Sequence, residues 1–263
     1  MSWNTVAAEG ELFVRILRAH RPDGNWLPHA RWTRTGRHSF SAKQNDVVIE
    51  TDVLTSSQPF DGIEVRAEGV RFDLLALATP VHGEPSAPGG AIELDVPGRS
   101  QYVFEHERGW CSPTTLSMLN AFYGHDFDVP GTARAVFDSA YNGTGNWAFN
   151  MAFSGSLGLH AVAAYLRNLE HAAAFLRAGI PLALSYSWGG DELPGAPIEH
   201  SDGHLVVLRG FDADGDCIVN DPASPNLTEV YPRDAIERIW MRNKGVAFIV
   251  ARQGTDIEAL VNA

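Results

Sequence analysis

Residues 109–124 constrain the fold more than any other stretch, because they place a cysteine where a loop becomes a helix. Pro113 suits a first helical turn, where its missing N–H has no helical partner. Cys111 or Ser112 is the expected N-cap. Apolar residues then recur at helical spacing, at Leu116, Leu119, Phe122 and Tyr123. A thiol here faces the positive end of the helix dipole, which favours the reactive thiolate. The position of Cys111 is also consistent with a buried structural cysteine, because free cysteines are among the most buried residues.

Charge and composition exclude several classes of function. The chain of 263 residues has a formal net charge of −12, which disfavours nucleic acid and anionic membranes as partners. The sequence contains no run of 18 apolar residues, so it predicts no transmembrane helix. The two cysteines, Cys111 and Cys217, are too few for a disulfide framework and lack zinc-site spacing. We therefore expect no metal and no cofactor. The N-terminus lacks the features of a secretory signal, so a cytoplasmic location is the default expectation.

The chain divides by pattern into two parts. Short alternating strands predict a β-rich, sandwich-like accessory domain over residues 1–91. Residues 82–90 are rich in Gly and Pro, which is typical of a linker. Residues 92–263 show helices first and then mostly antiparallel strands, an α+β pattern. Helices are expected at 131–141, 147–157 and 169–178, and strands at 182–186, 205–211 and 216–220.

His204 and Asp221 flank two neighbouring strands. If residues 205–211 and 216–220 pair through the Asp214-Gly215 turn, both side chains lie at the same end of a hairpin. A carboxylate there would accept an imidazole N–H and set the tautomer. Asn220 is the neighbouring alternative for this role. The acidic run around the turn lacks the glycine and glutamate positions of an EF-hand loop, so it predicts a hairpin turn rather than a calcium site.

Other residues are candidates for holding a substrate. An acyl-transfer site needs donors for a developing oxyanion, and Gln101 is the side-chain amide closest upstream of Cys111. Glycine- and aromatic-rich segments beside a site are typical of a cleft lining. Five such residues are expected to bind substrate: Trp110, Asn146, Trp147, Trp188 and Gly203.

The order Gln101, Cys111, His204, Asp221 resembles that of papain-like cysteine peptidases. Residues 92–263 are most similar to the bacterial double-glycine peptidase-like family, family thirty-nine of the cysteine peptidases. The motifs that carry the resemblance are Val96-Pro97 with Ser100-Gln101, Trp110-Cys111-Ser112-Pro113-Thr114, Gly203-His204-Leu205-Val206-Val207 and Val219-Asn220-Asp221-Pro222-Ala223-Ser224. The resemblance implies a papain-like fold with Cys111 as nucleophile, His204 as general base, Asp221 as orienting acid and Gln101 as oxyanion donor.

Two departures accompany the resemblance. Ser112 stands where leader peptidases usually carry glycine, and the gap between Gln101 and Cys111 is longer than in papain-like enzymes. The expected activity is cleavage of amide bonds in a peptide or protein substrate through an acyl-enzyme. A papain-like deamidase, transglutaminase or amidase uses the same chemistry, and a catalytically silent binding module remains a further alternative. Because some members of the family that it resembles are exported, secretion is the alternative to the cytoplasmic location.

Overall fold

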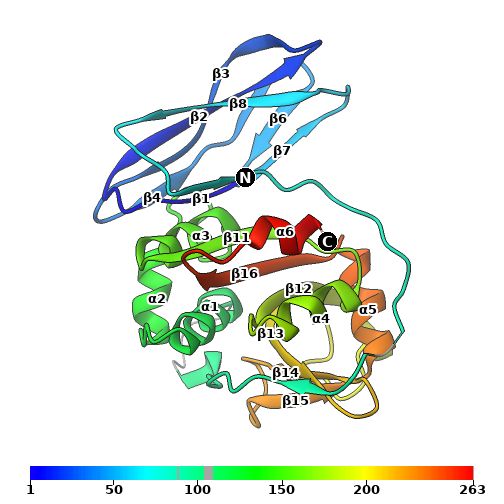
Figure 1. Cartoon of the computed structure of the whole chain (residues 1–263). Coiled ribbons are helices and arrows are strands. Elements are labelled where there is room, and N and C mark those ends of the chain that lie inside the picture. The colour runs from blue at the N-terminus through cyan, green and yellow to red at the C-terminus, as the bar shows by residue number, and fades with distance from the viewer. Residues whose placement is uncertain (88, 104–108, 263) are drawn as a thin grey trace.

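The computed structural model describes residues 1–87, 89–103 and 109–262, so position 88 of the expected linker lies outside them. Strands of the N-terminal region form an upper layer above a body of helices and one large sheet (Figure 1). The chain between the two runs extended along the outside of the body (Figure 1). The α+β class, with helices and an antiparallel sheet after a β-rich region, is confirmed.

The N-terminal region consists of short strands in small antiparallel sheets. One sheet has the order β4-β3-β2-β8 and another the order β5-β6-β7, while β1 pairs with β9. The sequence of β2 favours a strand, because Leu12, Val14 and Ile16 occupy every second position and are buried on one face. The strands are β1 (Ser2–Asn4), β2 (Gly10–Arg18), β3 (Arg21–Trp32), β4 (Arg37–Ser39), β5 (Ala42–Gln44), β6 (Val47–Glu50), β7 (Val53–Ser56), β8 (Gly62–Glu68) and β9 (Leu74–Ala76).

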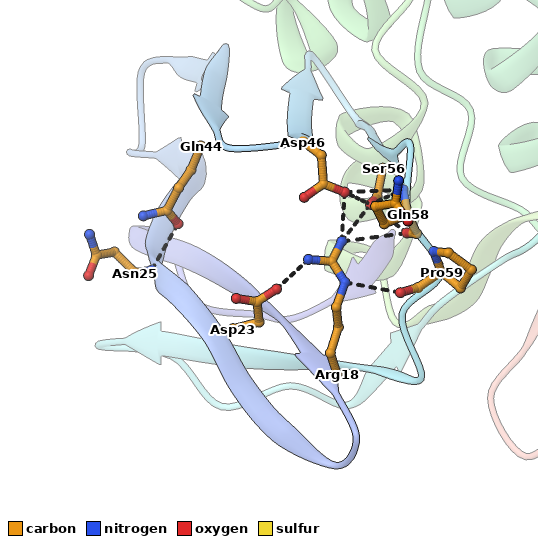
Figure 2. Close-up of polar contacts among 8 residues, drawn as sticks. All are labelled: Arg18, Asp23, Asn25, Gln44, Asp46, Ser56, Gln58 and Pro59. Carbon is orange, nitrogen blue, oxygen red and sulfur yellow. Dashed lines mark hydrogen bonds and ion pairs between the residues drawn. The ribbon is translucent and has the colours of Figure 1, made fainter.

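Arg18, the last residue of β2, joins two of these sheets (Figure 2). Its guanidinium donates to Asp46 Oδ2 at 2.7 Å and to Ser56 Oγ at 2.9 Å, and it also pairs with Asp23. The hydrogen bond from Ser56, together with that from Arg18, lowers the pKa of Asp46 to about 2. A guanidinium shared by several acceptors fixes the β5-β6-β7 sheet against the β2-β3 hairpin.

The first strand ties this region to the rest of the chain. Asn4 Nδ2 donates to the Ala161 carbonyl at 2.8 Å, and Ala161 N donates back to Asn4 Oδ1 at 2.9 Å. Trp3 is buried with its ring 5.8 Å from that of Phe149. Strand β1 is thus packed against the C-terminal body and hydrogen-bonded to it. The division of the chain at residue 91 stays a prediction.

The C-terminal body is built on an antiparallel sheet of order β11-β16-β12-β13-β14-β15, with β10 paired to β13. Its central strands carry long apolar runs, such as residues 205–208 and 246–251, because helices cover both faces. Ala183, Val207 and Phe248 pack toward α1 (Cys111–Phe122) and α3 (Trp147–Ser156), while their neighbours Leu182 and Leu208 pack toward α4 (Leu169–Arg177) and α5 (Arg233–Arg242). The strands are β10 (Ile92–Glu93), β11 (Leu159–Tyr165), β12 (Leu182–Trp188), β13 (Ser201–Phe211), β14 (Cys217–Asn220), β15 (Thr228–Tyr231) and β16 (Val246–Arg252).

One expected helix is shorter than its pattern suggested. The helix expected over 131–141 is α2 and ends at Val136, because Asp138 pairs its backbone with Arg37 of β4 and with Gly143. None of the described helices has the length and apolar character needed to cross a membrane. The helices are η1 (Gln101–Val103), α1 (Cys111–Phe122), α2 (Val129–Val136), α3 (Trp147–Ser156), α4 (Leu169–Arg177), η2 (Gly190–Glu192), α5 (Arg233–Arg242) and α6 (Ile257–Asn262).

Candidate active site

Cys111 is the first residue of α1, and its side chain is half-buried. Trp110 is the N-cap and makes no side-chain capping bond, so the expectation that Cys111 or Ser112 caps the helix is wrong. Ser112 instead donates its hydroxyl to Asn150 Oδ1 on α3, at 3.1 Å. The backbone N–H groups of Ser112 and Leu205 donate to the Cys111 thiol and help to lower its pKa. This environment favours a negative charge on sulfur.

Helix α1 is held against β13 at the level of the cysteine. Thr115 lies one turn beyond Cys111, and its hydroxyl donates to the Leu205 carbonyl at 3.1 Å. Leu116 and Leu119 are fully buried between the helix and the sheet. Because Leu205 directly follows His204, this contact places the start of α1, with the Cys111 thiol, beside the His204 imidazole.

His204 and Asp221 meet at one end of the β13-β14 hairpin. The hairpin pairs Val207 with Asn220 and Leu208 with Val219, which confirms the expected pairing through the turn. His204 Nε2 lies 2.8 Å from Asp221 Oδ1, and both side chains are buried. The other imidazole nitrogen, Nδ1, is left for Cys111, whose thiol is hydrogen-bonded to the His204 side chain.

Asp221 is held by two further donors. Ala223 N donates to Oδ1 at 2.8 Å, and the Tyr231 hydroxyl donates to Oδ2 at 2.8 Å. Sequence reasoning missed Tyr231, which ends β15 and is buried opposite Cys217. The available signal was a tyrosine at a buried strand position, since a buried hydroxyl normally needs a partner. The carboxylate therefore has one orientation, aimed at the imidazole.

The charges of this set reinforce one another. Burial raises the pKa of the Cys111 thiol, but the hydrogen bond and positive charge of His204 outweigh it, so the net shift is downward. Burial lowers the pKa of His204, yet its bonds to Asp221 and Cys111 outweigh that effect and raise the pKa to about 9. Opposite charges within hydrogen-bond reach stabilise each other. The arrangement thus favours a thiolate beside an imidazolium at neutral pH.

Cys111 opens onto a groove of about 1220 Å³. Of the five residues expected to bind substrate, Trp110, Trp147 and Gly203 line this groove. Asn146 and Trp188 are buried and lie outside its lining. Asn146 caps α3 by accepting from Phe149 N at 3.1 Å.

Trp188 packs its ring edge-on against His204, with 5.6 Å between the ring centroids. Contact with a buried indole keeps water away from the imidazole and its bond to Asp221.

Gln101 lies in η1 and is buried. Its backbone N–H donates to the Pro222 carbonyl at 2.9 Å, next to Asp221. Its carboxamide oxygen has no hydrogen-bond partner among the described residues, and the side chain is not part of the groove lining. The structure thus brings Gln101 to the Asp221 end of the site, and its role toward an oxyanion stays a prediction.

Within residues 1–87, 89–103 and 109–262, no group of three His, Cys, Asp or Glu side chains is arranged to hold a metal ion. Cys217 is buried in the core, and burial raises its pKa far above the ordinary thiol range. This second thiol is therefore inert in the folded protein.

Comparison with known proteins adds a family assignment. A family model described as the peptidase C39-like family matches residues 93–248. No curated protein matches the sequence. A solved structure described as a C39-like peptidase from Bacillus anthracis aligns at 19% identity with a TM-score of 0.49, over 64% of this chain and 100% of its own. A double glycine motif protease from an AMS/PCAT transporter, solved with its leader peptide, aligns at 18% identity with a TM-score of 0.43, over 62% and 98%.

Proposed function

The chain belongs to the peptidase C39-like family, and we propose that it hydrolyses peptide bonds through the Cys111 thiolate. The observation that carries the proposal is the hydrogen-bonded set of Cys111, His204 and Asp221 beside an open groove. A nucleophile, a base and a group that orients the base are the parts that covalent catalysis of acyl transfer requires.

The proposed reaction has two stages. The thiolate attacks the scissile carbonyl, and the carbonyl oxygen becomes an oxyanion that the N–H of Cys111 and the side-chain amide of Gln101 stabilise. The His204 imidazolium then donates its proton to the leaving amine, which leaves a thioester. Water, deprotonated by neutral His204, attacks the thioester, the acid product leaves, and the Cys111 thiolate and the His204 imidazolium are restored. Asp221 stays ionised and keeps the imidazole in position.

Alkylation by iodoacetamide tests the thiolate directly. An ordinary thiol with a pKa of about 8.5 is roughly 0.3% thiolate at pH 6. We expect wild-type Cys111 to react fast at that pH, and His204→Ala to slow it by about tenfold to hundredfold, because the two strongest effects that lower the thiol pKa are lost while burial still raises it. His200→Ala, an exposed histidine four residues away, is the matched control and should leave the rate unchanged. Equal rates in wild type and His204→Ala would refute the thiolate–imidazolium pair.

Peptide hydrolysis itself is tested with a synthetic library of ten-residue peptides in water enriched in oxygen-18. Mass spectrometry should find fragments whose new carboxyl group carries the heavy isotope, and Cys111→Ser should produce none. A deamidase would instead label intact peptides at glutamine or asparagine, and a transferase would join two peptides. Fast alkylation without any product would favour the binding-module alternative.

A further inference from the structure

Part of the groove wall comes from outside the family match. Thr35 precedes β4 and Val53 opens β7, and both line the groove that holds Cys111. Their side chains are exposed, so neither is part of a packed core. The N-terminal β-rich region therefore faces the same space as the candidate nucleophile.

A buried carboxylate anchors this wall at one end. Asp138 Oδ1 accepts from the backbone N–H of Ser39 in β4 at 3.0 Å, and its Oδ2 accepts from Asn146 Nδ2 at 2.8 Å. Ser139 N also donates to the Arg37 carbonyl at 3.0 Å. Strand β4 is thus bonded to the segment between α2 and α3, several of whose residues line the groove. A fully buried carboxylate with several donors has little freedom to move.

A second carboxylate anchors the other side. Asp52 Oδ2 accepts from the backbone N–H of Trp147 at 2.7 Å, at the start of α3. A carboxylate at a helix N-terminus is favourable because of the unpaired N–H groups and the helix dipole. Val53 follows Asp52 directly, so this bond sets the position of Val53 relative to Trp147.

The groove shares part of its lining with a second cavity. Five residues line both the groove and an adjoining cavity of about 520 Å³, namely Val53, Trp147, Tyr165, Lys244 and Val246. Two are aliphatic, two are aromatic, and lysine covers apolar surface with its stem. The two spaces therefore share a mainly apolar stretch of wall. Cys111 lines the same groove as this stretch of wall.

We infer that the β-rich region supplies one side of a substrate subsite, in which Val53 and Trp147 hold a large apolar side chain of the peptide being cleaved. The inference rests on the proposed function, because the occupant is the peptide whose bond lies at Cys111. Burial of an apolar side chain between an aliphatic and an aromatic wall is favourable and selects for Leu, Ile, Met or Phe over polar residues. Val53 is thus a specificity-determining residue outside the family match.

Peptide binding to an inactive variant tests this subsite separately from catalysis. Cys111→Ala protein is immobilised and exposed to the ten-residue library, and retained peptides are sequenced by mass spectrometry. We expect large apolar residues to be enriched at one position, and Val53→Gln in the same background to reduce that enrichment about tenfold. Val230→Gln is the matched control, since Val230 is also an exposed strand valine, at 52% against 43% for Val53, and lies on β15 away from the groove.

The outcomes separate the two proposals. Cleavage by the wild type with the same residue preference in Val53→Gln would overturn the subsite and leave the peptidase proposal standing. Retention that depends on Val53, without cleavage by the wild type, would refute the peptidase and leave Val53 as part of an apolar peptide-binding site. Absence of any apolar enrichment would also overturn the subsite. Circular dichroism melting of each variant checks the fold, and Thr35→Gln provides a second probe of the same wall.

Discussion

Replacing Tyr231 with phenylalanine tests the support of Asp221 by removing a single oxygen atom. The Tyr231 hydroxyl donates to Asp221 Oδ2 at 2.8 Å, and both side chains are buried. Phenylalanine fills the same space, so the variant loses this hydrogen bond with little change in packing. A hydrogen bond to a charged group contributes about 1.5–3 kcal/mol. We therefore expect the free energy of unfolding to fall by about 2 kcal/mol at pH 7.

Urea denaturation followed by tryptophan fluorescence measures this difference. Burial raises the pKa of Asp221, but its bond to His204 outweighs burial and the net shift is downward. The stabilisation is therefore present above the ordinary carboxyl pKa of about 3.9 and is lost as pH falls through the folded-state value. The difference between wild type and Tyr231→Phe should shrink in acid accordingly.

Tyr123→Phe is the control for Tyr231→Phe. It removes a buried hydroxyl that has no hydrogen-bond partner among the described residues. Its stability should stay equal to wild type or rise slightly, because an unpaired buried hydroxyl costs free energy. Equal losses in the two variants, or no loss in Tyr231→Phe, would refute the assigned role of Tyr231.

Two further predictions concern the charge beside His204 and the first strand. Asp221→Asn removes the carboxylate that raises the pKa of His204, so the pH midpoint of Cys111 alkylation should move upward by about one unit, and an unshifted midpoint would contradict the reasoning. Asn4→Ala removes two hydrogen bonds to the backbone of Ala161, so the free energy of unfolding should fall by about 2–4 kcal/mol. Hydrogen exchange at the Ala161 amide should accelerate in that variant, and unchanged protection would contradict the contact.

The hairpin that carries His204 and Asp221 was accessible from the sequence because its signals are local. Two apolar runs flank the Asp214-Gly215 turn, and the turn sets which residues lie opposite one another. Helix ends were less accessible. The helix expected to reach Tyr141 stops at Val136, because its chain pairs with a strand from the N-terminal region. No local sequence pattern predicts this pairing with a distant strand.

Sequence reasoning by itself was sufficient for the α+β class, the cysteine at a helix start, and the shared hairpin end of His204 and Asp221. Tertiary packing was needed to bring Tyr231 to Asp221 and Val53 to the groove. It also turned Trp188 toward the imidazole and away from the groove. The physical reason is that periodicity shows which face of an element is buried, whereas the neighbour that covers that face depends on contacts between segments distant in the chain.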